Sequence, residues 1–412
     1  MATSTPVKKG LPAETVVKEG YKQTELGVIP EDWGDRVFKS LYSESSRNGI
    51  YKTAEFQGRG TRIVNMGEMF GFEFISDQEM SRVELTKKEL VLSGLQDGDL
   101  LFGRRSVVPA GAGKCSIVVS LQEPLTFESS IIRVRLNSEE ANPLYYYYFF
   151  ASQTGRTLIS TIVSGTNIKG IRASELKELI IPLPTKTEQS AIATVLSDTD
   201  ALIESLDKLI AKKKAIKQGA MQQLLTGKKR LPGFSGEWEV KKLGDFLDYE
   251  QPTAYLVTDT EYNDNNSTPV LTAGKSFFLG YTNEEHGIFN KLPVIIFDDF
   301  TTAVQFVDFP FKAKSSAMKM LLPKNEKINL RFIYEIMLQI KFPLGDHKRH
   351  WIGEYQHLEI SVPATYKEQI AIATVLSDMD SEIEKLEQKR DKYAMLKQGM
   401  MQVLLTGKIR LV

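Results

Sequence analysis

EQSAIATVLSD (188–198) and EQIAIATVLSD (368–378) repeat one phrase at a distance of 180 positions. Extended in both directions without a gap, residues 185–231 match residues 365–411 at 28 of 47 positions. A repeat of this length indicates a duplicated structural unit, so it constrains the fold before any other pattern does. The chain therefore divides into two repeated segments and two unlike segments that precede them.

Each repeat has the pattern of one long helix. Apolar residues recur at helical spacing, and each copy ends in Thr-Gly-Lys, with Gly227 and Gly407 placed as helix C-caps. A helix of about 40 residues spans roughly 60 Å and needs a partner along its length. Its own duplicate is the nearest candidate, which predicts an antiparallel coiled-coil pair related by a pseudo-two-fold axis.

Polar letters also recur in both copies, which favours similar partners for the two helices. The simpler alternative is a duplicated helical hairpin that serves only as a core. Gly219 and Gly399 lie inside the helices, where each costs about 1 kcal/mol relative to Ala, so either a close backbone neighbour or a kink is expected. The residues expected at subunit interfaces are Gln189, Leu196, Ile203, Leu206, Gln369, Leu376, Ile383 and Leu386.

The segments before the helices have the pattern of α+β domains. Strand-like runs such as 130–136, 293–300 and 318–323 lie between Gly-bearing turns. Asn142 and Asn329 are each placed to cap a helix, and the aromatic run 145–150 is more typical of a helix in the core than of a base-stacking surface. The predicted organisation is an N-terminal tail (1–20), a globular domain (21–184), a long helix (185–230), a second globular domain (231–364) and a second long helix (365–412).

Composition excludes several classes of protein. No apolar run reaches the roughly 18 residues of a membrane span, so a cytoplasmic protein is expected. The single cysteine, Cys115, allows no intrachain disulfide and no thiolate zinc cluster. The 52 basic and 52 acidic residues balance, yet residues 237–308 sum to −9 and residues 312–349 to +6. Part of one domain can therefore face a polyanion although the whole chain is neutral.

Catalytic signatures are missing. GAGKCS (111–116) lacks the first Gly and the final Ser/Thr of a phosphate-binding loop, and we find no dinucleotide fingerprint, nucleophile elbow or Cys/His signature. His347 and His350 are three apart, but no other metal-ligand cluster accompanies them. The sequence does not indicate an enzyme.

Short basic and amide-bearing clusters lie in the loops of both globular segments. Arg, Lys, Asn and Gln can contact base edges, and Lys, Ser and Thr commonly hold phosphates. SGTNIKGIR (164–172) and HKRHW (347–351) occupy the same place in the two segments, before a short strand that leads into the long helix. In the first segment the candidate contacts are Arg59, Arg62, Arg104, Arg105, Lys114, Thr166, Asn167, Lys169 and Arg172. In the second segment they are Lys312, Lys314, Ser315, Lys319, His347, Lys348, Arg349 and His350.

This chain resembles the specificity subunit of type I restriction-modification enzymes. The resemblance is carried by YKQTELGVIPEDW (21–33), by IPLP-x-x-x-EQ-x-x-IA (181–193), by its partner VP-x-x-x-x-EQIAIA (362–373) and by the LKQGMMQVLLTGK type of helix end. It covers essentially the whole chain past residue 20. SGTNIKG follows the small polar loop of the family pattern, whereas GDHKRHW departs from it.

The resemblance implies a non-catalytic subunit with two target recognition domains. Each would read one half of a bipartite, asymmetric site in double-stranded DNA, and the helix pair would act as a ruler between them. Two methylation subunits would dock on the helices and carry S-adenosylmethionine, and two restriction/translocation subunits would bring ATP and Mg, while this chain would bind no cofactor. The alternative from the residues alone is a coiled-coil scaffold with two protein-binding heads and no DNA readout.

Overall fold

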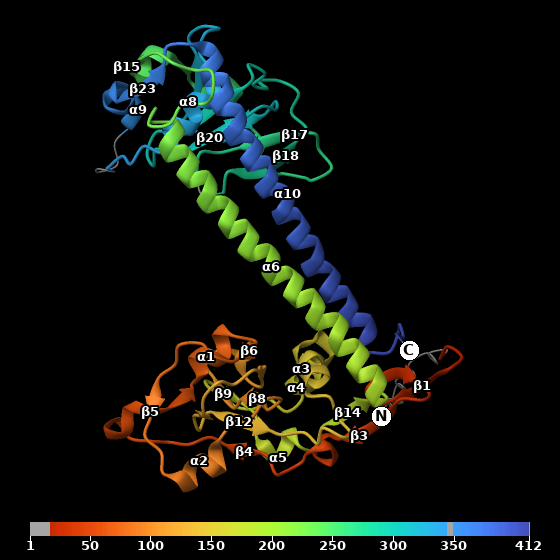
Figure 1. Cartoon of the computed structure of the whole chain (residues 1–412). Helices are drawn as coiled ribbons and strands as arrows, with labels where there is room; N and C mark the ends of the chain where they lie inside the picture. Colours follow the sequence, from red (N-terminus) through yellow and green to blue (C-terminus); the bar gives the residue numbers. More distant parts are fainter. Residues whose placement is uncertain (1–16, 275, 344–348, 412) are drawn as a thin grey trace, which may run out of the picture. The chain divides into compact units, whose positions relative to one another are not determined.

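The computed structural model describes residues 17–274, 276–343 and 349–411, and their contacts divide the chain into two compact units. The first unit holds the chain up to Ser205 together with the segment from Arg390 onward, and the second holds Leu206–Lys389. Each unit therefore combines a globular domain with the beginning of the long helix that follows it and the end of the other long helix (Figure 1). The predicted organisation gave the helices segments of their own, whereas the contacts join each half-helix to a globular domain.

The first globular domain is built on two sheets. The larger sheet has the strand order β4 (Arg47–Asn48), β12 (Ile131–Val134), β8 (Leu100–Gly103), β10 (Cys115–Val118) and β6 (Phe74–Ile75). The smaller has the order β11 (Leu125–Phe127), β5 (Gln57–Val64) and β7 (Arg82–Val83). The two-stranded pairs are β1 (Tyr21–Thr24) with β2 (Gly27–Pro30), β3 (Gly34–Val37) with β14 (Ile180–Leu183), and β9 (Arg105–Ser106) with β13 (Lys169–Gly170).

The second globular domain repeats much of this topology, with one strand fewer in its larger sheet. Its larger sheet has the order β16 (Leu247–Glu250), β22 (Met318–Pro323), β19 (Val294–Asp298) and β20 (Val304–Val307). Its smaller sheet has the order β18 (Phe278–Thr282), β17 (Thr268–Leu271) and β21 (Lys312–Ala313), and β15 (Trp238–Lys242) pairs with β23 (Glu359–Pro363). In both smaller sheets the middle strand has one parallel and one antiparallel neighbour. The two domains are thus copies of one α+β plan.

Each globular domain also contains short helices and 3-10 turns. In the first domain the helices are α1 (Met66–Gly71), α2 (Lys87–Ser93), α3 (Pro143–Ala151), α4 (Gln153–Ser160) and α5 (Ala173–Leu176). In the second they are α7 (Leu243–Phe246), α8 (Leu330–Met337) and α9 (His350–Gly353). Short 3-10 turns are η1 (Phe38–Leu41), η2 (Ala54–Phe56), η3 (Pro109–Gly111), η4 (Pro252–Tyr255) and η5 (Tyr355–His357).

The aromatic helix α3 lies in the core of the first domain. All six side chains from Tyr145 to Phe150 are at most 1% exposed, so the prediction of core packing is confirmed and base stacking is excluded for this run. Asn142 caps the helix as expected, because its Oδ1 accepts from the amide of Leu144 at 3.0 Å. Asn329 caps α8 in the same way, accepting from the amide of Phe332 at 2.9 Å.

The long helices are α6 (Lys186–Leu224) and α10 (Tyr366–Leu404), each of 39 residues and so about 58 Å long. Within each unit they run antiparallel. In the first unit Lys397 Nζ lies 2.5 Å from Asp200 Oδ1, and in the second Lys217 Nζ lies 2.6 Å from Asp380 Oδ1. These two ion pairs join repeat-equivalent residues, since each position differs by 180. The predicted antiparallel pairing and internal two-fold pattern are confirmed.

Each helix end is clamped to a globular domain by an equivalent set of residues. In the first unit the guanidinium of Arg410 pairs with the buried carboxylate of Glu188, whose Oε2 also accepts from the indole Nε1 of Trp33 at 2.8 Å. In the second unit Arg230 Nε donates to Glu368 Oε1 at 2.5 Å and its guanidinium lies over Trp238. These clamps explain why Glu and Arg recur at the same places in both repeats.

Gln189 and Gln369 have a structural role, which corrects their assignment to a subunit interface. Gln189 is fully buried, its Oε1 accepts from the amide of Asn142 at 2.7 Å, and its Nε2 donates to Pro184 O at 3.0 Å. Gln369 makes the equivalent bonds to Asn329 and Pro363 at 3.0 and 3.3 Å. Both side-chain amides form hydrogen bonds that attach the start of a long helix to the domain before it, so neither is free to contact a partner.

The apolar residues predicted at interfaces also pack within the chain. Four of them are buried among the described residues, and two are half-buried. The buried ones are Leu196, Leu206, Leu376 and Ile383, and the half-buried ones are Ile203 and Leu386. Gly219 and Gly399 have no other described atom within 4 Å of where a Cβ would lie, so the chain itself supplies no close backbone neighbour there.

Candidate nucleic-acid interface

Two basic clusters that are far apart in the sequence meet in the first domain. Strand β9 pairs antiparallel with β13, with Gly170 opposite Arg105, and the amide of Ile171 donates to Arg104 O at 3.0 Å. Gly165 makes the connecting loop possible because its φ is +105° and a Cβ there would lie 2.2 Å from Ile168 O. The pairing places Arg104 and Arg105 beside the loop at 164–172.

We call Arg104, Arg105, Lys169 and Arg172 the cationic cluster. All four line a cleft of about 340 Å³. Among the described residues the cluster has one carboxylate partner, Glu175, which lies 3.7 Å from Arg172. Four cations with a single carboxylate partner are suited to bind a polyanion, because their N–H groups remain free to donate hydrogen bonds to phosphate. Thr166 and Asn167 lie exposed in the same loop.

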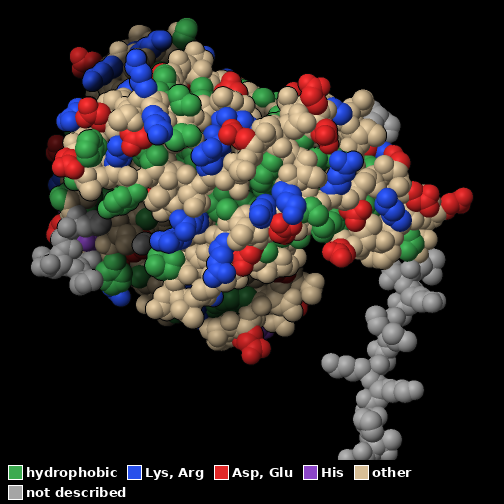
Figure 2. Space-filling model, turned by 90° about the horizontal axis from the view of Figure 1, so that it is seen from below, with side chains coloured by type: hydrophobic (Ala, Val, Ile, Leu, Met, Phe, Trp, Pro, Cys, Tyr) green, Lys and Arg blue, Asp and Glu red, His purple; other side chains and the backbone are tan. Residues whose placement is uncertain are grey.

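The cationic cluster differs from the rest of the surface because most of its charges lack carboxylate partners, and not because Lys and Arg are concentrated on one face. Figure 2 shows Lys and Arg side chains interspersed with acidic ones over the visible face. Most cations in the first domain are paired. Arg59 is exposed, but its Nε and Nη2 donate to Glu84 Oε2 at 3.0 and 2.6 Å, so its charge is largely offset.

Arg62 is buried, contrary to its selection as a candidate contact, and Lys114 is half-buried. Arg62 is 4% exposed and pairs with Asp77 and Glu123 at 3.1 and 2.8 Å. Lys114 Nζ donates to Phe70 O at 2.8 Å, and burial lowers the pKa of this amine. Their sequence context is that of loop cations, but both are used to hold neighbouring segments together.

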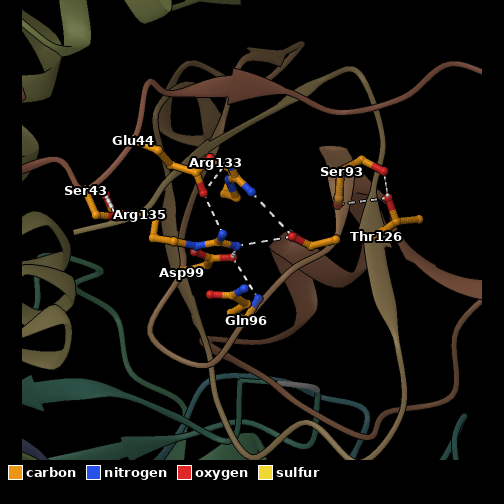
Figure 3. Close-up of polar contacts among 9 residues, drawn as sticks. Ser43, Glu44, Ser93, Gln96, Asp99, Thr126, Arg133 and Arg135 are labelled. Carbon is orange, nitrogen blue, oxygen red and sulfur yellow. Dashed lines mark hydrogen bonds and ion pairs between the residues drawn. The ribbon is translucent and has the colours of Figure 1, made fainter. Parts of the chain in front are cut away.

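An ion-pair network joins the strands β8 and β12, and the cluster begins where β8 ends. Arg135 donates from Nε and Nη2 to Asp99 Oδ1 and Oδ2, both at 2.7 Å, and Glu44 pairs with Arg135 and Arg133 at 2.5 and 3.1 Å (Figure 3). Burial lowers the pKa of Arg133, whereas the hydrogen bond to Asp99 raises the pKa of Arg135. The network ties together one end of β8 and β12, and Arg104 leaves the other end, where its amide donates to Ser130 O at 2.7 Å.

The second domain has the same backbone hydrogen bond between its corresponding loop and the end of the central strand, which we call the junction, but the side chains there differ. The amide of His350 donates to Asp299 O at 2.9 Å, just as Ile171 donates to Arg104 O, so Asp299 occupies the place of Arg104. Asp299 is buried, accepts from the amide of Trp351 at 2.9 Å, and pairs with Lys319 at 3.3 Å. The two loops therefore correspond, but the residue at the place of Arg104 is a buried carboxylate in the second domain.

Three candidate contacts of the second domain are buried, and two of them, Lys312 and Lys319, form ion pairs inside the domain. Lys312 is 3% exposed and pairs with Glu284 at 2.7 Å, Lys319 is 1% exposed, and His350 is 2% exposed. These residues are therefore not available at a surface. Lys314 and Arg349 are exposed and Ser315 is half-buried, whereas His347 and Lys348 lie outside the described residues.

The described residues give no sign of a metal centre or of a membrane segment. Among residues 17–274, 276–343 and 349–411, no group of three or more His, Cys, Asp or Glu side chains is placed to hold a metal ion. Within the same ranges no helix combines the length and the hydropathy needed to cross a membrane. Cys115 is buried, and its burial raises the pKa of the thiol.

Comparison with known proteins gives a consistent picture. The type I restriction enzyme EcoR124I/EcoR124II specificity subunit of Escherichia coli is 51% identical over 148 residues, which are 35% of this chain and 36% of that relative. The putative type I restriction enzyme MjaX specificity subunit of Methanocaldococcus jannaschii is 27% identical over 430 aligned residues, which cover 95% of this chain and 97% of that relative. The first alignment thus spans about a third of its relative, whereas the second spans nearly the whole of it.

A solved structure has the same fold. The crystal structure of the S subunit of a type I restriction-modification system from M. genitalium superposes with a TM-score of 0.63 over 90% of this chain and 96% of that one, at 16% identity. The family model for the type I restriction modification DNA specificity domain matches residues 31–215 and again residues 235–392. Since these two matches cover most of the chain, one over each globular domain, this protein belongs to the family of type I restriction-modification DNA specificity proteins.

Proposed function

We propose that this chain is the sequence-specific DNA-recognition subunit of a type I restriction-modification complex and has no catalytic site of its own. The observation that carries the proposal is the cationic cluster, which is assembled by the pairing of β9 with β13 in a member of a DNA specificity family. Phosphate contacts of this kind supply affinity and orientation, and side chains beside them read the bases.

Each globular domain contacts one half of a bipartite site in this proposal. The domains share most of a strand order, yet the place of Arg104, which lines the cationic cleft in the first domain, holds the buried Asp299 in the second. Domains with one scaffold and unlike side chains contact unlike bases. The two half-sites are therefore expected to differ in sequence.

The long helices in this proposal set the spacer between the half-sites and dock two methylation subunits. Support comes from Gly219 and Gly399, which lie at equivalent places of the repeat and leave helix backbone uncovered by other described atoms. Two equivalent uncovered positions suit two copies of one partner. S-adenosylmethionine would belong to those methylation subunits, and ATP and Mg to two further restriction/translocation subunits, all in the cytoplasm.

The test is to measure DNA binding by the full chain co-expressed with its methylation subunit. Arg104→Ala should weaken binding about 10- to 100-fold at 150 mM salt, because it removes a charge-assisted contact. Arg59→Ala is the matched control, since Arg59 is an exposed arginine of the same domain that Glu84 already pairs, and it should change affinity less than threefold.

The readout is fluorescence anisotropy on randomised and selected duplexes, followed by genome-wide mapping of methylated adenine. A sequence preference by the wild-type complex with a selective loss in Arg104→Ala supports the proposal. A wild-type complex without any sequence preference contradicts it and favours a scaffold with two protein-binding heads.

A further inference from the structure

A second cleft lies next to the cationic cluster and is lined by different kinds of side chain. It encloses about 730 Å³ on the smaller sheet of the first domain, between β5, β7 and the turn that precedes β12. This volume is within the range of ordinary ligand sites. The polar side chains that line it include Tyr51, Gln57, Ser81 and Ser129.

Several of these polar groups lack partners. Gln57 Nε2 has one contact, at 3.5 Å to Lys52 O, which is the outer limit of a hydrogen bond. The side-chain hydroxyls of Tyr51, Ser81 and Ser129 make no hydrogen bond to any described residue, and Tyr51 is 80% exposed. The cleft therefore offers an amide, three hydroxyls and an aromatic ring that the domain does not use for its own stability.

The cations around this cleft are already paired, and the Glu128 carboxylate that also lines it accepts from the amide of Met66 at 2.7 Å. Lys52 Nζ lies 2.7 Å from Glu89 Oε1, and Arg82 Nη2 lies 2.9 Å from Glu123 Oε1. We call this cleft the neutral cleft because it holds no free cation, and it is poorly suited to phosphate, which the free cations nearby attract better. It is suited to base edges, which are neutral and present hydrogen-bond donors and acceptors.

Arg104 joins the two clefts. Its Nη1 donates to Ser129 O at 3.3 Å, and Ser129 lines the neutral cleft while Arg104 lines the cationic one. A DNA strand held by its phosphates on the cationic cluster would therefore present its bases beside the neutral cleft. This arrangement matches the division of labour in DNA recognition, in which phosphate contacts position the duplex and base contacts specify it.

We propose that this neutral cleft reads base edges of the half-site of the first domain and that Gln57 is a specificity-determining residue within it; the inference rests on the proposed function. A glutamine amide can donate and accept at once, which matches the N6 and N7 edge of adenine. Tyr51 supplies apolar contact surface, as suits a thymine methyl group or a base face.

The smaller sheet of the second domain also borders a cleft, of about 770 Å³, lined in part by β17 and β18. Its lining combines aromatic side chains, among them Phe278 and Phe309, with the polar side chains of Ser267 and Asn290. The two smaller sheets therefore border clefts with unlike side chains, which suits two domains that read unlike half-sites.

The experiment selects binding sequences from a randomised duplex library, with the full chain bound to its methylation subunit. Gln57→Ala should lose about 5- to 150-fold discrimination at one or two adjacent positions of one half-site, while affinity for unselected DNA changes less than threefold. Gln57→Glu should move the preference at that position towards cytosine, whose N4 amine a carboxylate accepts. Tyr51→Ala should relax a neighbouring position of the same half-site.

Two control variants separate the possible outcomes. Gln122→Ala changes an exposed glutamine outside the cleft and should leave all preferences intact, and Arg105→Ala should weaken binding to all sequences alike. Unchanged selected sequences in both Gln57 variants, or a uniform loss like that of Arg105→Ala, would overturn the inference while the proposed function stands. A wild-type complex that selects no sequence would instead overturn the proposed function itself.

Discussion

Asp99→Ala tests how the first globular domain holds its central strands. The Asp99 carboxylate is fully buried and accepts three hydrogen bonds, two from Arg135 at 2.7 Å and one from the amide of Gln96 at 2.8 Å. Its removal leaves two guanidinium groups, those of Arg133 and Arg135, around the single carboxylate of Glu44. The variant therefore contains a largely enclosed positive charge without a partner.

The expected loss follows from the geometry of this network. Breaking one side of a buried ion pair costs about 3–5 kcal/mol. The Arg135 side chain is 20% exposed and keeps Glu44 as a partner, so the lower end of that range, about 3 kcal/mol, applies. A domain has only about 5–15 kcal/mol of stability, so the change in the unfolding midpoint should be large.

The assay is urea unfolding followed by the fluorescence of Trp33, which belongs to the first unit. Trp238→Phe and Trp351→Phe in the background remove the signal of the second unit. Asp35→Ala is the control, because Asp35 is exposed, and it should shift the free energy of unfolding by less than about 0.5 kcal/mol.

The double variant Asp99→Leu/Arg135→Met gives the critical comparison. Replacing both partners with apolar groups should recover much of the stability, because no unpaired charge remains beside Glu44 and Arg133. A loss in Asp99→Ala no greater than that in Asp35→Ala would refute the reasoning, as would a double variant less stable than the single one.

Five further variants test the helix clamps, the glycines at the helix ends and the carboxylate of Glu284. Arg410→Ala should lower the unfolding free energy of the first unit by about 1–2 kcal/mol after allowance for solvent screening, and Arg230→Ala should lower the stability of the second unit alone, both measured by urea unfolding. Gly407→Ala should destabilise more than Gly227→Ala in thermal unfolding, because φ is near +68° at both sites but only at residue 407 would a Cβ lie 2.5 Å from a proline ring. Hydrogen bonds from the Asp259 backbone and from Lys312 lower the pKa of Glu284 to about 2. The ionised carboxylate therefore contributes fully to the free energy of unfolding above its usual pKa of 4.5, and this contribution is lost as pH falls towards 2. Glu284→Gln should flatten that part of the stability–pH profile.

The repeated phrase was sufficient to predict the helices but not the reason for its polar letters. Length, periodicity and the C-cap glycines all indicated two matched helices, and the structure confirms them. Glu188 and Gln189 were open to more than one interpretation, because a recurring polar residue on a helix can face a partner or its own domain. Only the tertiary structure shows that both are buried against the domain that precedes them.

The candidate interface was predictable in part. Arg104 and Lys169 were each visible as loop cations, but strands of two residues such as β9 and β13 carry no periodicity, so their pairing could not be inferred. Lys312 and Lys319 belong to the same type of sequence pattern and are buried, because ion pairs with Glu284 and Asp299 offset their desolvation. The neutral cleft around Gln57 was missed since free amides and hydroxyls leave no charge pattern.

The helix clamps have the same residues in both domains, whereas the junctions between loop and sheet have different ones. Glu188 and Glu368 bind an arginine in the same way in both units, so a change in either would release a helix from its domain. Arg104 and Asp299 also occupy one equivalent place, yet they carry opposite charge without disturbing the backbone hydrogen bond that defines it. The backbone hydrogen bond is therefore the same in both domains, whereas the side chain is internal only in the second, where Asp299 is buried beside Lys319. In the first domain the backbone holds Arg104 at the edge of the cationic cluster, and a fixed backbone below a variable side chain is what a recognition surface requires.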